Sequence, residues 1–152
     1  MIRLAFTFLL LFSVFTNASE LQARFELDSK IYTAGVRLAE FRTDVLDVTY
    51  KALHADDVKI VFNVYITNIG GKPIKIDASA FSITSLGTKE IVNADNPRNL
   101  ASAAEKNDYF PKVTLNHNGS AGGRISFSVR NAEGRWALKN KLTGHFVNFA
   151  VK

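Results

Sequence analysis

Metal or proton chemistry in this chain would have to come from its three histidines and the acidic residues beside them. The histidines are His54, His117 and His145, and none has a second ligand at a spacing typical of metal sites. His54 is nearest to such a cluster, because Asp56 and Asp57 follow it on one turn and could bind a divalent cation weakly. We interpret this group as a solvated turn, and we predict no metal site and no cofactor.

Nucleophilic catalysis requires a serine, threonine or cysteine that is activated by a neighbouring base. The chain has no cysteine and no Gly-x-Ser-x-Gly elbow. Asp56 and Asp57 are adjacent, so on a strand they would face opposite sides, which does not suit joint acid–base work. The possibility of a Ser–His–Asp set assembled from distant loops stays open. We nevertheless expect a protein that is not an enzyme and has no catalytic residues.

One predicted loop, at 131–141, combines an aromatic ring with positive charge. It holds Trp136 together with Arg135, Lys139 and Lys141. A ring can stack on a sugar, and cations can meet acidic groups, so these four residues are our candidates for a carbohydrate or anionic-polymer contact. The alternative is that Trp136 seals the bottom of the fold, and we favour that interpretation.

The basic residues are spread along the chain rather than gathered in a block. The 152 residues fit one domain and carry a net charge of +5. Scattered positive charge is typical of a solubility requirement, although it leaves an anionic partner such as a polysaccharide or a membrane surface open. The absence of cysteine excludes disulfides, thiolate zinc sites and a lipid-modified N-terminal cysteine.

The first nineteen residues have the pattern of a signal peptide. A short positive start precedes an apolar run at 4–15, and Thr16 and Ala18 place small side chains where a signal peptidase reads them. The run holds about twelve residues, whereas a membrane-spanning helix needs about twenty. We therefore predict a signal peptide at 1–19, no membrane span after its removal, and a single β-sandwich domain at 20–152 that is periplasmic or secreted. An uncleaved membrane anchor or a buried helix is the alternative.

The clearest strand in the sequence covers 60–66. Its even-numbered positions are all apolar, which is the period of a strand with one buried face. Strands at 45–53, 58–67 and 73–76 are predicted to form a three-stranded meander. At 77–80 the apolar positions change from even to odd numbers, so we expect a bulge or corner that begins a new strand in the facing sheet.

The second half of the chain holds shorter strands and one irregular section. Asn96 before Pro97 is typical of a helix start, so we expect two or three helical turns across one open end of the fold. The glycine-rich stretch 116–123 predicts a flexible hairpin tip, and strands are predicted at 124–130 and 147–151. Seven to nine strands with at most one short helix predict an all-β fold, a two-sheet immunoglobulin-like antiparallel sandwich.

Three segments carry a resemblance to a known family. The hairpin at 59–74, the strand at 81–84 and the strand at 123–129 with its leading glycine resemble the bacterial extracytoplasmic immunoglobulin-like domains of secreted antigens and lipoproteins. The resemblance implies secretion, a sandwich fold and a binding or structural role, with no catalytic residues to transfer. The lipoprotein members need a cysteine that this chain lacks.

These observations predict an exported, non-enzymatic binding or interaction protein of the cell envelope. The expected partner is an envelope protein or a polysaccharide, and not a nucleic acid. A structural subunit that assembles through exposed edge strands is the first alternative. A small hydrolase or a metal-binding protein is the second alternative.

Overall fold

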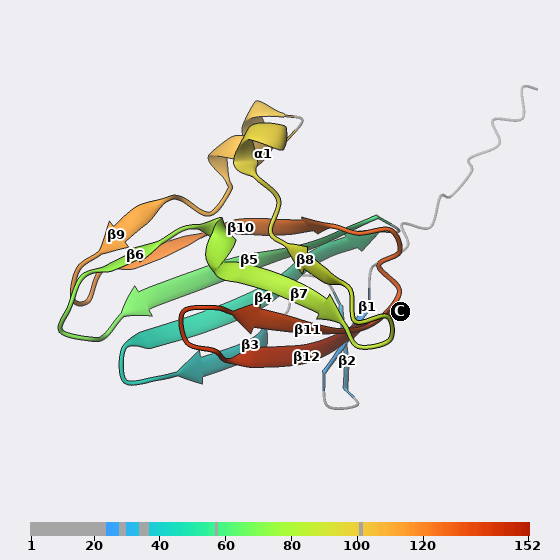
Figure 1. Cartoon of the computed structure of the whole chain (residues 1–152), viewed down its shortest axis with the longest axis horizontal. Helices are drawn as coiled ribbons and strands as arrows, with labels where there is room; N and C mark the ends of the chain where they lie inside the picture. The colour runs from blue at the N-terminus through green and yellow to red at the C-terminus, as the bar shows by residue number, and fades with distance from the viewer. Residues whose placement is uncertain (1–23, 28–29, 34–36, 57, 101) are drawn as a thin grey trace, which may run out of the picture.

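The computed structural model describes residues 24–27, 30–33, 37–56, 58–100 and 102–152 (Figure 1). The signal segment expected at 1–19 lies outside these residues. The described elements, in chain order, are β1 (Arg24–Leu27), β2 (Lys30–Thr33), β3 (Arg37–Arg42), β4 (Leu46–Asp56), β5 (Lys59–Asn68), β6 (Ile74–Ile76), η1 (Ala78–Ala80), β7 (Phe81–Ser85), β8 (Ile91–Asn93), η2 (Pro97–Asn99), α1 (Ala103–Asn107), β9 (Val113–Leu115), β10 (Ser120–Ser128), β11 (Gly134–Asn140) and β12 (Phe146–Val151).

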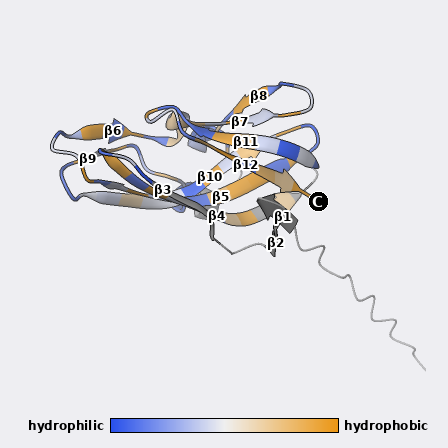
Figure 2. Cartoon of the chain, turned by 90° about the horizontal axis from the view of Figure 1, so that it is seen from below, coloured by the Kyte–Doolittle hydropathy of each residue, from blue (hydrophilic) through white to orange (hydrophobic). Residues whose placement is uncertain are grey.

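Two large antiparallel sheets form the body of the fold. One sheet has the order β2-β1-β12-β11-β7-β8, and the other has the order β10-β5-β4-β3. Aromatic side chains from the two sheets meet between them, with ring centroids 5.2 Å apart for Phe62 and Phe149 and 6.3 Å apart for Tyr50 and Phe81. Figure 2 shows the same layers from below, with apolar segments recurring along the strands. The prediction of an all-β, antiparallel, layered fold is confirmed.

The prediction of two sheets and seven to nine strands is wrong for the described residues. They contain twelve strands, and β6 pairs with β9 in a third, two-stranded sheet. We expected β6 to continue a meander beside β5, but Ile74 pairs with Leu115 instead. The antiparallel hairpin of β4 and β5 is as predicted, with Val48 opposite Ile66.

The change of face at 77–80 is a corner, as expected. Asp77 caps the short turn η1 by accepting a hydrogen bond from the Ser79 N–H, at 2.8 Å. The chain then enters β7, which lies beside β11 in the six-stranded sheet. Phe81 and Ile83 are fully buried there, so odd-numbered positions now face the core that β5 reaches with even-numbered ones.

The irregular section holds less helix than predicted. Asn96 caps η2, since its Oδ1 accepts from the Arg98 N–H at 2.9 Å, but this 3₁₀ turn has only three residues. The five-residue helix α1 follows and stands at the top of Figure 1. Tyr109 and Phe110 then return to the body and are buried. No helix in the described part of the chain has the length and apolar composition needed to cross a membrane.

Candidate functional site

The four residues predicted as a binding patch lie on and just after a strand, not in a loop. Strand β11 occupies most of the expected loop and pairs with β7 on one side and β12 on the other. The Trp136 side chain is 4% exposed, and its indole N–H donates to the Ala132 carbonyl at 2.8 Å. Trp136 therefore belongs to the core, as the sealing interpretation expects, and its ring is not open to stacking on a ligand.

Strand alternation also separates the three cations from the ring. Arg135 and Lys139 are exposed and occupy the opposite face of β11 from Trp136. They are four residues apart, or about 13 Å along a strand. Lys141 lies beyond β11, where its ammonium donates to the Ser79 carbonyl at 2.9 Å and to Asn93 Oδ1 at 2.8 Å. The structure does not bring the four candidates together.

Lys141 instead contributes to a basic hollow beside the short sheet of β6 and β9. This hollow measures about 660 Å³ and is also lined by Lys75, Lys112 and Asp77. The hydrogen bond from the Ser79 hydroxyl is the main cause that holds the pKa of Asp77 below its usual value, and the charge of Lys112 adds to it. The carboxylate of Asp77 offsets part of the positive charge of the hollow.

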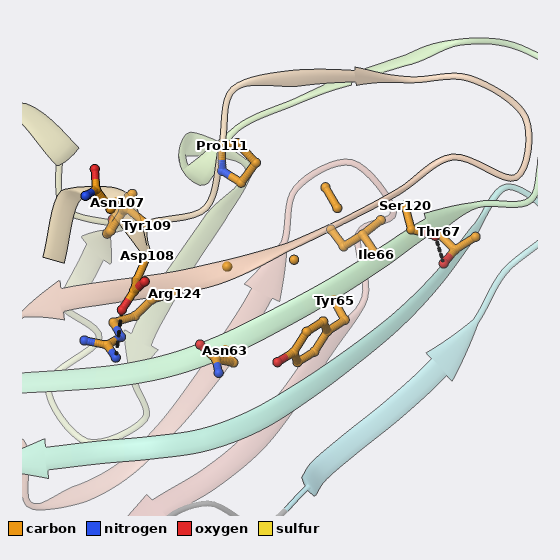
Figure 3. Close-up of a pocket in the computed structure, with 13 residues that line it drawn as sticks. Asn63, Tyr65, Ile66, Thr67, Asn107, Asp108, Tyr109, Pro111, Ser120 and Arg124 are labelled. Carbon is orange, nitrogen blue, oxygen red and sulfur yellow. Dashed lines mark hydrogen bonds and ion pairs between the residues drawn. The ribbon is translucent and has the colours of Figure 1, made fainter. Parts of the chain in front are cut away.

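A larger groove lies against β5 and β10 (Figure 3). It measures about 910 Å³ and is bounded by side chains of β5 at 63–67, by the segment 107–111 and by β10 at 120–124. We call it the edge groove. Tyr65 is half exposed and lies along one side of the groove, while Asn63, Thr67 and Arg124 supply polar groups. The edge groove thus combines an accessible ring with hydrogen-bonding side chains.

Two adjacent glycines allow two different parts of the chain to approach β10. A Cβ atom on Gly122 would lie 2.6 Å from Tyr65 Cδ1, so the tyrosine ring rests directly on this glycine. A Cβ atom on Gly123 would lie 2.6 Å from the Phe110 Cα, on the other face of the strand. The prediction of a flexible tip at 116–123 is therefore wrong for 120–123, which are paired with β5.

Most of the outer edge of β10 is closed by hydrogen bonds from the segment 108–110 and from Asp95. The Arg124 N–H donates to the Asp108 carbonyl at 2.7 Å, and the Phe110 N–H donates to the Arg124 carbonyl at 2.8 Å. Asp95 closes the next part, because its N–H donates to the Ser126 carbonyl at 2.8 Å and its Oδ1 accepts from the Ser128 N–H at 3.1 Å. Such coverage is how native sheets protect an edge from unwanted pairing.

The edge stays open at Gly122 and Ser120. In an antiparallel ladder, alternate residues direct both backbone groups to the same side. Arg124 uses that side for 108–110, so the N–H and C=O groups of Gly122 and Ser120 point the same way. Neither residue has a backbone partner there among the described residues. Pro111 has no N–H to offer, and the chain leaves the edge after it to reach β9.

Charged and titratable groups at the end of the edge groove have structural partners. Arg124 lies 3.7 Å from Asp108 as an ion pair, and its buried Nε makes no hydrogen bond among the described residues. Burial raises the pKa of Tyr109 to about 12, and its hydroxyl donates to the Asp95 carbonyl. Tyr109 therefore holds in place the segment 107–111, which forms one side of the edge groove.

The histidines do not assemble a metal site in the part of the chain that the structure describes. No group of three metal-ligating side chains gathers among those residues. The predicted turn is wrong at His54 and Asp56, whose backbone belongs to β4 and pairs with Val61 and Lys59 of β5. All of Asp57 lies outside the described residues. His117 Nδ1 lies 3.0 Å from the Gly70 carbonyl, and this contact anchors the turn before β10.

No family model matches the sequence, and no curated protein matches it either. Among solved structures, the yjhA protein of Bacillus subtilis is similar at a TM-score of 0.52 and 14% identity, over 67% of this chain and 78% of that one. The ycdA protein of Bacillus subtilis, a candidate lipoprotein, reaches a TM-score of 0.49 and 16% identity over 74% of this chain. This chain spans only 38% of the ycdA chain.

A protein of unknown function from Listeria monocytogenes reaches a TM-score of 0.49 and 12% identity, over 78% of this chain and 83% of that one. At such identities a structural likeness shows the fold alone. The yjhA likeness therefore shows that this all-β architecture occurs in a bacterial protein, and it assigns no ligand or activity.

Proposed function

We propose that this chain is an exported, immunoglobulin-like sandwich protein of the cell envelope that binds a partner through the edge groove and has no enzymatic activity. The observation that carries the proposal is the edge groove itself, where the exposed ring of Tyr65 lies beside an open stretch of strand edge. The signal-peptide pattern at 1–19 supports export.

The groove has the composition expected of a contact surface. Tyrosine supplies a large contact area with few rotatable bonds and one polar end, and it is enriched at binding sites. Tyr65 rests on Gly122, so part of its motion is already restricted before a ligand arrives. Restriction in the free protein lowers the entropy cost of binding.

Binding accounts for the groove better than catalysis does. Burial raises the pKa of Tyr109, and its hydroxyl donates a hydrogen bond to the Asp95 carbonyl. Arg124 and Asp108 are paired with each other and lie near the attachment of 108–110 to β10. The polar groups of Tyr109, Arg124 and Asp108 thus contact other parts of the protein. The surface that a ligand can reach in the groove is formed by Tyr65 and the open strand edge.

A titration of the isotopically labelled exported protein, followed by amide NMR, tests the proposal. The probes are soluble peptidoglycan glycan strands freed of their stem peptides, and peptides selected from a random library displayed on phage. We expect at least one probe to shift the amide signals of Gly122 and Arg124. Tyr65→Ala should weaken that binding about tenfold, because a central aromatic contact contributes upwards of about 1.4 kcal/mol.

Leu142→Ala is the matched control, because Leu142 is exposed like Tyr65 but lines the basic hollow instead. It should leave the affinity of the probe unchanged. The proposal is overturned if both probe classes leave the groove signals in place, or if Tyr65→Ala and Leu142→Ala have equal effects.

Assembly through exposed edges is the second candidate function. Ile91 on the edge strand β8 favours it, because this side chain is 67% exposed. Light scattering of the exported protein across a range of concentrations tests this candidate. A dimer or larger species that Ile91→Lys dissociates supports assembly, and a monomer at all concentrations excludes it.

A further inference from the structure

We propose that the edge groove takes an extended polypeptide segment, which adds as a strand to the open edge of β10 at Ser120 and Gly122. This inference rests on the proposed function and names the ligand class of the same site. It is the mode in which main-chain hydrogen bonds supply affinity and the side chains beside the edge supply selectivity.

The backbone geometry of the open edge fits a polypeptide. Gly122 and Ser120 each direct one N–H and one C=O toward the groove, and they are separated by two residues of strand, about 6.6 Å. A second strand repeats complementary groups at the same interval, so it can form up to four hydrogen bonds with these two residues. A sugar chain does not carry alternating amide donors and acceptors at this spacing.

The neighbouring chain shows that this edge accepts pairing. Two backbone hydrogen bonds already join 108–110 to Arg124, and they form a short parallel bridge at Tyr109. The bridge stops at Pro111, where the chain moves away from β10, and the edge groove lies in the space that this departure leaves. An added segment would extend a pairing that the fold itself begins.

The surroundings of the edge provide contacts for alternate side chains of the added segment. The Tyr65 ring covers the outer face of Gly122, so it would meet a side chain that points outward from the new strand. Asn107 and Asp108 lie at one end of the groove, and Thr67, hydrogen-bonded to Ser120 at 2.8 Å, lies at the other. The ends are polar and the middle is aromatic.

Peptides selected from a random dodecapeptide library against the exported protein provide the first test. Each backbone amide of a selected peptide is N-methylated in turn. Amides that face β10 should lose at least about tenfold in affinity when methylated, while alternate amides, which face away, should stay within about threefold. Equal effects at all positions, or no alternation, would overturn the proposal.

A matched pair of protein variants gives the second test. Gly122→Ala and Gly122→Pro both add a Cβ beneath the Tyr65 ring, but only the proline removes the edge N–H. Proline is tolerated where a strand N–H points away from the sheet. We expect Gly122→Pro to bind the selected peptide at least about tenfold more weakly than Gly122→Ala, at equal thermal stability.

The outcomes separate this inference from the proposed function. If peptidoglycan glycan strands freed of their stem peptides bind at the edge groove and no peptide is selected there, the polypeptide inference is overturned and the proposed function stands. If neither probe binds at the groove, both are overturned. If the edge pairs with a second copy of this chain, light scattering shows a dimer that Gly122→Pro dissociates, and the separate-peptide inference is overturned.

Discussion

Trp136 and Tyr65 have opposite roles because they occupy opposite faces of their sheets. The indole of Trp136 lies between the layers and donates its only N–H to the Ala132 carbonyl. Tyr65 points outward over Gly122 and is half exposed. A strand side chain changes face with every residue, so the type of aromatic residue does not decide which of them meets a ligand.

Removing the Trp136 ring should therefore destabilise the protein rather than remove a ligand contact. We expect Trp136→Ala to lower the free energy of unfolding by about 3–5 kcal/mol, which is typical of a large buried aromatic side chain. Trp136→Phe keeps most of the buried surface and should cost less, mainly through the lost hydrogen bond. Chemical denaturation measures both. A loss below about 1 kcal/mol for Trp136→Ala would show that the ring is not part of the core.

Asn68 shows what the sequence leaves out at the scale of a single residue. Its position after the β5 apolar run predicts the start of a turn, and Gly70 does donate its N–H to Asn68 Oδ1 at 3.0 Å. The fully buried side chain also donates to the carbonyls of Lys72 and Leu115, both at 2.8 Å. Leu115 is 47 residues away, and the spacing of residues along the chain gives no sign of this contact.

Elements with uninterrupted alternation are the ones that the sequence predicts correctly. β5 and β12 have apolar residues at every second position, and both form where expected. β11 has the same period, but a buried polar residue, Asn140, replaces the apolar residue that its inward face would need. The sequence analysis predicted a loop at 131–141, and β11 shows that prediction to be wrong at 134–140.

The first half of β10 could not be found from strand propensity, because Gly122 and Gly123 weaken any such signal. Tertiary contacts explain why glycine occupies both positions, since Gly122 accommodates the Tyr65 ring and Gly123 accommodates the Phe110 backbone. The candidate site was missed for the same cause. The adjacent glycines could have indicated the candidate site, because glycine within a strand often marks a place where another part of the chain or a ligand approaches the backbone closely.

The two glycines should respond differently to the same substitution. Gly123→Ala places a methyl group against the backbone at Phe110, which cannot rotate away, so we expect a loss of about 1–3 kcal/mol in unfolding free energy. Gly122→Ala meets the exposed ring of Tyr65, which can turn toward solvent, and should cost less than about 1 kcal/mol. Urea denaturation of the two variants provides the comparison. Equal losses would contradict the assigned contacts.

At the scale of the whole molecule, long-range pairing decides how the sheet edges are covered. β10 pairs with β5 across more than fifty residues, as the hydrogen bond between Thr67 and Ser120 illustrates. The connection between them supplies β7 and β8 to the other sheet and then returns through 108–110 to cover part of the β10 edge. Pairing between segments so far apart depends on the packing of the whole fold, and it cannot be predicted from the local periodicity of the sequence.

Export of the whole molecule is a prediction from the first nineteen residues of the sequence, and processing there can be measured directly. The small residues Thr16 and Ala18 predict cleavage just after Ala18, so the intact mass of the processed protein should correspond to a chain that begins at Ser19 or Glu20. Ala18→Leu should leave the precursor uncleaved, because a bulky side chain replaces the small one that the peptidase requires. Asn17→Leu, at the intervening position, is the matched control and should be processed normally. Full-length protein that retains Met1 and stays in the cytosol would overturn export, and with it the expectation that the edge groove meets its partner in the envelope.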